Sequence, residues 1–287
     1  MLFHNYLYLL NKIFFMKVFL YPFLLVTLLQ SDFYSNDTDA QELQGRAYYF
    51  SMSKLELGNW GARMSEAQKK QIKARLKNRL EKTYILNFSS EESLFVEEEK
   101  VDAISGATDS WGSNFARGKQ YKNITENSLV QAQEFYGKRF LVKDKLQAFD
   151  WKLGSDTKEI GGYTCFKASA IVPTEELRWY NFEWSDLSNN STDTTEKDIQ
   201  LTQVEAWYTM QIPLQTGPAE FWGLPGLILE VSAGNTTILC SEIIINPKAK
   251  EKITAPDKGT EINKVDYRST IVNKMLEMRN NRGRRRG

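Results

Sequence analysis

The chain is nearly without histidine. Its one histidine, His4, lies in an N-terminal stretch that we expect to be removed on export. A mature chain without histidine excludes Ser-His-Asp and Cys-His catalysis, histidine-ligated zinc and imidazole acid–base chemistry. An enzyme would have to use carboxylates, lysine, tyrosine or cysteine, so binding and structural roles gain weight.

Cysteine is also scarce, with Cys165 and Cys240 as the two thiols. Two thiols are too few for a four-ligand zinc site, and we expect neither a metal nor a cofactor. In an oxidising compartment they form either a disulfide or two free core residues. Strand alternation places Cys240 on the apolar face of the hairpin with Val231. In its own strand, Cys165 lies on the other face from Phe166. That register counts against the disulfide, although a bulge would reverse it.

Net charge is close to zero, at +1. Such a balance gives no electrostatic case for a nucleic-acid partner, which needs a basic face. The C-terminus is an exception, because five arginines crowd its last nine residues: Arg279, Arg282, Arg284, Arg285 and Arg286. This tail is either a solvated end or a contact for anionic lipid, a polyanion or an acidic partner.

The N-terminal apolar run is too short to cross a bilayer. Residues 18–29 give about 12 apolar positions after Met16-Lys17, which fits a signal peptide and falls short of the roughly 20 that a span needs. We favour a true start at Met16 and a cleaved export segment within residues 1–40; the alternative is one interrupted anchor over residues 1–29. Either way we expect a protein of the periplasm or cell envelope, or a secreted one.

Strand patterns dominate the rest of the chain. We expect strands at residues 47–50, 84–88, 93–96, 129–136, 140–142, 163–172, 204–209, 227–232 and 237–245. Gly234-Asn235 is a suitable two-residue loop for the last hairpin, in which Val231 would face Ile238 and Leu229 would face Cys240. Residues 104–119 suit a loop or insertion, and residues 152–158 are polar. The pattern indicates a β-rich α+β fold with an antiparallel sheet.

One clear helix is expected at residues 65–82. Ser65 and Gln68 have the spacing of a capping box. An apolar stripe recurs every four residues from Ile72 to Leu80, so we expect this helix to pack on the sheet. A short helix is indicated from Ile271 to Met278. With no repeat and no linker, we predict one domain at residues 41–270 and a basic tail at residues 271–287.

Residues 217–231, Gly-Pro-Ala-Glu-Phe-Trp-Gly-Leu-Pro-Gly-Leu-Ile-Leu-Glu-Val, are the most informative stretch. Its stiff turns come from glycines that allow unusual backbone angles and prolines that fix φ: Gly217, Pro218, Gly223, Pro225 and Gly226. Pro225-Gly226 suits a type II turn, with positive φ at the glycine. The aromatic pair between the turns either plugs one end of the sheet or forms the rim of a site. For the second interpretation the ligand- or partner-binding residues are Trp207, Phe221, Trp222 and Leu224.

Four segments in order, at residues 158–168, 206–209, 212–213 and 217–231, resemble the GLPGLI family of exported proteins from Bacteroidota. That family has no established activity. The resemblance implies a polar insertion near residues 174–203. It also implies a likeness to proteins of the lipoprotein-carrier type, in which a curved antiparallel sheet, a meander or half-barrel, wraps one or two helices over an apolar cavity.

We therefore predict a non-enzymatic periplasmic binding or carrier protein. Its ligand would be hydrophobic, or its partner an outer-membrane protein, and its apolar cavity would be lined by the four residues named above. The alternative is an envelope adaptor or structural protein that docks through its sheet edge or basic tail. A third interpretation is a carboxylate-based hydrolase in which two of Glu205, Glu220 and Glu230 face each other across a cleft.

Overall fold

The computed structural model describes residues 43–55, 57, 61–98, 115–182, 199–248 and 252–284, with side chains as far as residue 281. The chain divides into two units, Met1–Glu42 and Leu43–Gly287, and the account below concerns the second. The predicted export segment lies outside the described residues. Within the described ranges, no helix combines the length and the hydropathy needed to cross a membrane.

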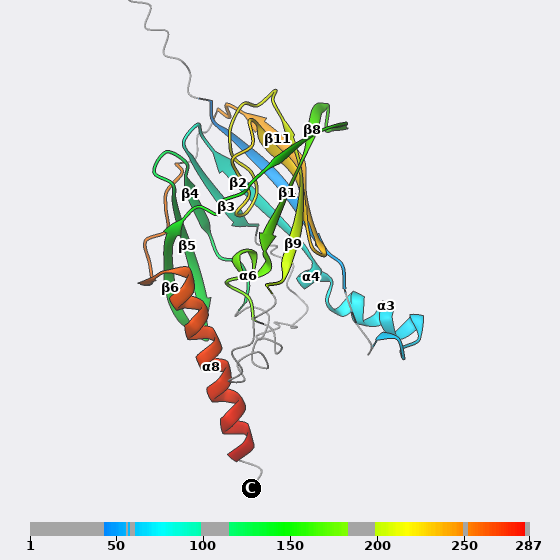
Figure 1. Cartoon of the computed structure of the whole chain (residues 1–287), viewed down its shortest axis with the longest axis vertical. Coiled ribbons are helices and arrows are strands. Elements are labelled where there is room, and N and C mark those ends of the chain that lie inside the picture. The colour runs from blue at the N-terminus through cyan, green and yellow to red at the C-terminus, as the bar shows by residue number, and fades with distance from the viewer. Residues whose placement is uncertain are drawn as a thin grey trace, which may run out of the picture. The chain divides into compact units, whose positions relative to one another are not determined.

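One large sheet organises the described residues, and it is open and curved (Figure 1). Its strand order is β12-β6-β5-β4-β3-β2-β1-β11-β10-β9-β8-β7. All neighbours are antiparallel except β12 and β6. The strands are β1 Gly45–Ser53, β2 Glu81–Phe88, β3 Glu92–Glu97, β4 Gln120–Asn123, β5 Ser128–Phe135, β6 Lys138–Lys145, β7 Lys152–Ile160, β8 Tyr163–Pro173, β9 Leu201–Thr209, β10 Leu227–Ala233, β11 Thr236–Ile245 and β12 Thr260–Ile262. The expected β-rich α+β fold with a curved antiparallel sheet is confirmed.

Helices are few among the described residues: α3 Glu66–Arg75, α4 Lys77–Leu80, α6 Thr174–Leu177 and α8 Lys264–Arg284. The capping box is confirmed, since Ser65 Oγ accepts from Gln68 N and Gln68 Oε1 accepts from Ser65 N. Two expectations for this helix are wrong. It breaks at Leu76, and α3 buries none of its residues. Figure 1 shows α3 extending away from the strands, so Ile72 does not pack on the sheet, whereas α4, which carries Leu80, contacts β1 and β2.

The hairpins were predicted well because apolar and polar residues alternate along both strands of each hairpin. Val231 pairs with Ile238, and the strands turn through Gly234-Asn235, as expected. The expected pairing of Leu229 with Cys240 continues the register of Glu230 with Leu239, at which the described β10–β11 pairing begins, so it stays a prediction. On its other side β10 has a bulge between Ile228 and Glu230, which leaves Leu229 without a register partner on β9. Three strands were not expected: β4 and β12 are short, and β7 is an edge strand with mostly exposed side chains.

Two apolar clusters lie on the inner face of the sheet. The main core joins β1–β3 and β8–β11 to the segment 210–226, which carries the two-turn signature, and it includes Tyr49, Leu86, Phe95, Ala206, Phe221 and Leu227. The second core joins β5, β6 and α8 to the chain after α6, and it includes Phe135, Phe140, Trp179, Phe182, Tyr267 and Met275. Residues 174–182, expected within a polar insertion, therefore contribute to a core; residues 183–198 lie outside the described ranges.

Helix α8 is longer than the predicted terminal helix and includes most of the predicted basic tail. Tyr267, Ile271 and Met275 recur every four residues and are fully buried in the second core. This spacing is that of one helix face, so the stripe fixes α8 against β6 (Figure 1).

Gly226 is required by close contact rather than by its backbone angle. It does not have the positive φ expected of a type II turn; among the signature glycines that angle belongs to Gly223, at 88°. A Cβ on Gly226 would instead lie 2.0 Å from the carbonyl oxygen of Thr209. We expect Gly226→Ala to lower the free energy of unfolding by about 1–3 kcal/mol, measured by urea denaturation. The control is Gly154→Ala on β7, which has no positive φ and where a Cβ would lie 3.2 Å from its nearest neighbour, the carbonyl oxygen of Lys167; an equal or larger loss there would contradict this explanation.

Candidate functional site

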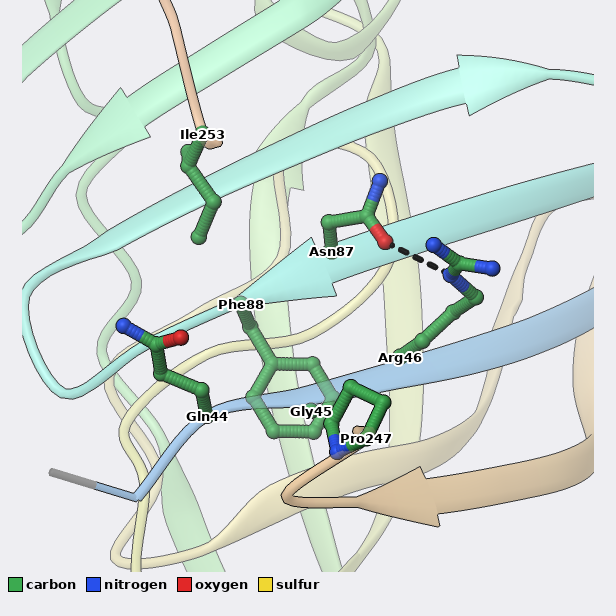
Figure 2. A pocket seen from close by; sticks show the side chains of 7 residues that line it. All are labelled: Gln44, Gly45, Arg46, Asn87, Phe88, Pro247 and Ile253. Carbon is green, nitrogen blue, oxygen red and sulfur yellow. Dashed lines mark hydrogen bonds between the residues drawn. The ribbon is translucent and has the colours of Figure 1, made fainter. Parts of the chain in front are cut away.

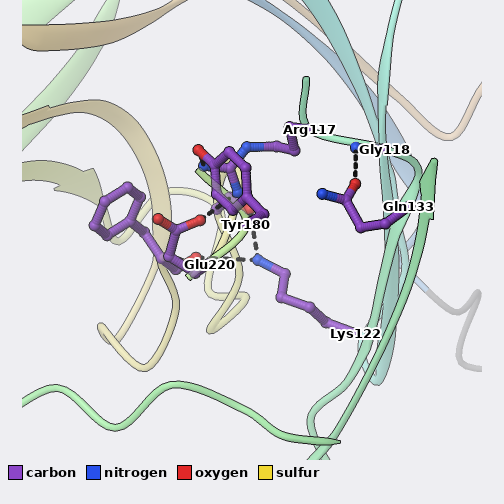
Figure 3. A network of polar contacts seen from close by, with 8 residues as sticks. Arg117, Gly118, Lys122, Gln133, Tyr180 and Glu220 are labelled. Carbon is purple, nitrogen blue, oxygen red and sulfur yellow. Dashed lines mark hydrogen bonds and ion pairs between the residues drawn. The ribbon is translucent and has the colours of Figure 1, made fainter. Parts of the chain in front are cut away.

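A buried lysine fastens the signature segment to the sheet. Lys122 lies on β4, is 0% exposed, and points toward the segment 217–221 (Figure 3). Its Nζ donates to the carbonyl oxygens of Gly217, at 2.8 Å, and Phe221, at 3.1 Å. Burial lowers the pKa of Lys122 to about 7, with Glu220 opposing that shift and Arg117 adding to it. A lysine otherwise suited to proton transfer is thus committed to two backbone carbonyls.

An ion pair lies beside this lysine. Arg117 precedes β4 and forms a hydrogen-bonded salt bridge with Glu220 of the signature segment. The same guanidinium donates to Tyr180 Oη at 2.9 Å and lies 4.8 Å from the centre of that ring. Glu220 holds the pKa of Arg117 above its ordinary value against the opposing effect of burial. Figure 3 shows these groups converging from three separate stretches of chain.

A seam of glutamines separates the two cores. One row of cross-strand partners runs Leu86, Phe95, Gln120, Gln131, Val142 across β2 to β6. Its apolar ends belong to the main and second cores, whereas its two middle residues are amides that are 1% and 0% exposed. Cross-strand partners share one face, so both amides point into the interior.

These amides make no hydrogen bond with any described part of the chain. The atoms without a partner are Nε2 and Oε1 of both Gln120 and Gln131. The oxygen of Gln133 accepts from Gly118 N at 2.7 Å. The side chain of Gln133 also faces the Tyr267 hydroxyl and lowers the pKa of Tyr267 against the larger, raising effect of burial. An unpaired buried polar group costs about 1–3 kcal/mol, so the glutamine seam lowers the stability of the fold.

The structure divides the four expected binding residues among different environments. Phe221 and Leu224 are buried in the main core. Trp222 is half-buried and donates from Nε1 to Gln147 O at 2.6 Å, while its own carbonyl accepts from Trp151 Nε1 at 2.8 Å. The aromatic pair is therefore part of an interior brace. To line a shared apolar cavity, the side chains of Phe221, Trp222 and Leu224 would instead have to face one another across open space.

Trp207 lies on the other face of β9. Its chain neighbours Ala206 and Tyr208 are buried in the main core, and side chains alternate along a strand. Lys158 Nζ lies 4.3 Å from the centre of the Trp207 ring, and Lys167 Nζ lies 5.7 Å away. Trp207 is thus partly buried against the main core and packs under two cations, rather than lining a shared cavity with Phe221 and Leu224.

Each candidate carboxylate has its own cation. Glu205 pairs with Lys167 at 2.8 Å, Glu230 pairs with Lys158 at 2.7 Å, and Glu220 pairs with Arg117. A glycosidase pair needs one carboxyl group held protonated and both facing the same bond. Individually neutralised carboxylates on both faces of the sheet do not suit that chemistry.

Cys165 and Cys240 are free and buried. Burial raises the pKa of Cys165 to about 11 and that of Cys240 to about 12. Both effects keep the thiols protonated and shielded, which disfavours nucleophilic chemistry. We expect neither thiol to react with Ellman's reagent until the protein is denatured, when both react. A denatured mass lower by two hydrogens, with no reactive thiol, would contradict the free state.

A small pocket lies at one edge of the main core, between Gln44, Arg46, Asn87, Phe88 and Pro247 (Figure 2). Its volume is about 10 Å³, which is about the space that one water molecule requires. Arg46 Nε donates to Asn87 Oδ1 across it at 2.9 Å. This pocket is too small for an organic ligand. Over the described ranges, no three acidic, cysteine or histidine residues gather as a metal site would require.

The sequence did not reveal the polar seam. β4 reads Gln-Tyr-Lys-Asn, a run without an apolar residue other than tyrosine, and polar runs are usually solvated. Only the alternation of Leu129, Gln131, Gln133 and Phe135 along β5 carried a signal, because it puts two amides on an otherwise apolar face. The partners of Lys122 and Arg117 lie about a hundred residues away, beyond any local pattern.

Comparisons with known proteins find one family model that is similar to part of the chain. A family model described as "Protein of unknown function (Porph_ging)" matches residues 151–230, from Trp151 to β10. No curated protein matches the chain. Two structures of PNGF-II, in space groups C2 and P21, are 16% identical over 80% and 79% of this chain, with TM-scores of 0.46 and 0.44. The chain spans 32% of PNGF-II in each case, about a third of its length.

Residues 151–230 are thus similar to a family of Bacteroidetes-type proteins to which no activity is assigned. The matched stretch contains β7 to β9 and nearly all of the signature segment, but neither Lys122 nor Arg117, to which that segment is bonded.

Proposed function

We propose that this chain is a non-enzymatic binding protein of the bacterial cell envelope. The observation that carries the proposal is the buried polar layer between the two cores. Its ionisable groups are committed to one another or to backbone carbonyls, while its neutral amides are left unpaired. Groups tied up in this way do not move protons, whereas unpaired amides in an interior are suited to holding a ligand.

We further propose that the chain belongs to the exported GLPGLI family of Bacteroidota. The family match at residues 151–230 includes Gly217 to Glu230, which carry the signature turns. Export, and a periplasmic or envelope location, follow from this proposal and from the apolar run at residues 18–29.

The proposed ligand differs from the hydrophobic one expected from the sequence. Phe221 and Leu224 are buried in the main core, so these two expected binding residues offer no open apolar surface to a lipid-like molecule. The ligand consistent with the interior is small and polar.

Native mass spectrometry of the protein recovered from its own envelope tests the binding function. We expect a bound small molecule that is released on denaturation, with the free protein mass giving the processing site. The control is the same protein unfolded and refolded in ligand-free buffer, which should lack the adduct. Identical native masses for the two preparations would contradict the proposal.

A second candidate function is an envelope adaptor. β7 is an open edge strand among the described residues, and apolar side chains are exposed on it and its neighbours: Leu153, Ile171 and Leu201, each 62% exposed. Exposed sheet edges pair with extended segments of other chains. Cross-linked capture of an outer-membrane protein that is lost on Leu153→Lys, but not on Met210→Lys at another exposed apolar site, would favour it.

A further inference from the structure

Helices α3 and α4, which with Leu76 between them form a basic arm over residues 66–80, carry a dense positive charge. Apart from one acidic residue, Glu66, the charged residues of the arm are all basic: Lys69, Lys70, Lys73, Arg75, Lys77 and Arg79. The whole chain carries only +1, so the rest of it is net acidic. Charge of one sign gathered on one element attracts a partner of the opposite sign.

The fold leaves much of this charge available. Lys70, Lys73 and Arg75 are exposed, and no carboxylate among the described residues pairs with them. Lys69 does pair with Glu66, but both side chains are exposed, so water screens the attraction.

Helix α3 also receives little support from the sheet. It buries none of its 10 residues, and Figure 1 shows it projecting beyond the strands. Isolated helices shorter than about 12 residues are marginal in water. Lys69 and Lys73 lie four residues apart, so like charges are neighbours on one face, which weakens the helix further. An anionic surface outside the protein would relieve this repulsion.

An apolar residue among the cations favours a lipid surface. Ile72 is partly exposed, and helical spacing places Lys69 and Arg75 one turn away on either side of it. This combination suits the boundary of a bilayer, because the cations reach headgroup phosphates while the apolar side chain contacts acyl chains. A nucleic-acid backbone offers no apolar layer for Ile72.

We propose that the basic arm docks on the surface of an anionic phospholipid bilayer, held mainly by Lys70, Lys73 and Arg75. This docking goes beyond the binding function proposed above and does not depend on it. Each cation at an anionic bilayer strengthens binding about fivefold, so removing three of them should weaken binding about a hundredfold.

Flotation of the full chain with vesicles tests this surface. Vesicles of phosphatidylcholine with roughly one-third phosphatidylglycerol are compared with phosphatidylcholine alone, and the excess of binding to the anionic vesicles is measured. We expect an excess at about 0.05 M salt that is largely lost at about 0.5 M, where the charges are screened. Binding through the apolar run at residues 18–29 would be equal on both kinds of vesicle and would resist salt.

The test variant combines Lys70→Gln, Lys73→Gln and Arg75→Gln, which remove the charges and keep good helix formers. It should lose the excess binding and keep the urea midpoint of wild type, because none of these side chains is buried.

The control variant makes the same change in net charge elsewhere. Lys138→Gln, Arg139→Gln and Lys152→Gln remove two exposed lysines and one exposed arginine from β6 and β7. It should bind anionic vesicles as wild type does.

Three results would overturn the inference. Equal losses in the two variants would show that net charge, rather than the basic arm, drives binding. Wild-type protein without excess binding to anionic vesicles would exclude the lipid surface. Binding of polyglutamate but not of vesicles, lost in the test variant, would make the partner an acidic protein. None of these results alters the native masses that test the binding function, so the two proposals fail separately.

Discussion

Lys122→Met is expected to lower the free energy of unfolding by about 1–4 kcal/mol at about pH 9, where little of the cost of deprotonating Lys122 remains, and by less toward pH 7. The substitution keeps the volume of the side chain but removes the donor that two buried carbonyl oxygens share, on Gly217 and Phe221. Each carbonyl is then buried without that partner, and the segment that carries the signature loses its attachment to β4. Urea denaturation of the variant against wild type measures the loss.

The same variant should change how stability depends on pH. The pKa of Lys122 is lowered to about 7 in the fold from its ordinary 10.5, so between these values the unfolded chain binds the extra proton. Stability therefore rises with pH from about 7, by up to about 1.4 kcal/mol per pH unit from this group. The raised thiol pKa values of Cys165 and Cys240 act in the opposite direction above about pH 9, where unfolded thiols ionise first.

The informative window is thus from about pH 7 to pH 9. Lys122→Met should lose the upward slope that wild type shows there. Lys138→Met removes an exposed lysine from β6 and should leave the slope unchanged. Parallel pH profiles for wild type and Lys122→Met would show that the lysine is not buried as described.

Breaking the Arg117–Glu220 pair is the second large effect. Arg117→Met leaves Glu220 as a buried unpaired carboxylate, and Glu220→Gln leaves an uncompensated guanidinium. Each substitution should cost about 3–5 kcal/mol in urea denaturation. The double variant should lose clearly less stability than the sum of the two single losses, because the second substitution removes the charge that the first left buried without a partner.

An exposed pair provides the control for this cycle. Lys143 and Glu261 join β6 to β12 with side chains that are 48% and 65% exposed. Their coupling should be below about 1 kcal/mol, since water screens both charges. Additive losses at Arg117 and Glu220, no larger than those of the exposed pair, would contradict a buried and mutually dependent ion pair.

The sheet was largely predictable because its strands repeat a local pattern. Ala168, Ala170 and Val172 are buried and alternate with more exposed neighbours, and the loop at Gly234-Asn235 fixes the pairing of Val231 with Ile238. Alternation and a two-residue loop can each be recognised from a few adjacent residues. The bulge at Leu229 was not predictable in this way, because it arises where β10 meets β9.

The site was less predictable because its contacts join distant residues. Phe221 and Trp222 were correctly identified as too apolar to leave exposed, but the sequence did not say that the segment crosses the inner face of the sheet. That position follows from Lys122, Arg117 and Trp151, whose partners within the segment are 71 or more residues away. Trp207 was assigned to the same site from its neighbourhood in sequence, whereas its place in the β9 alternation puts it on the other face.

Amide hydrogen exchange over residues 212–231 tests the central claim, that the signature segment is an interior brace beside a buried polar layer. Its backbone amides are bonded within the fold: Thr216 N to Leu214 O, Phe221 N to Pro218 O, Gly223 N to Gln215 O and Ile228 N to Thr216 O. We expect these amides to exchange only with global unfolding, and Lys122→Met to accelerate them together. Exchange within seconds in wild type, at the rate of an exposed loop, would show that the segment is a surface feature and would contradict the account.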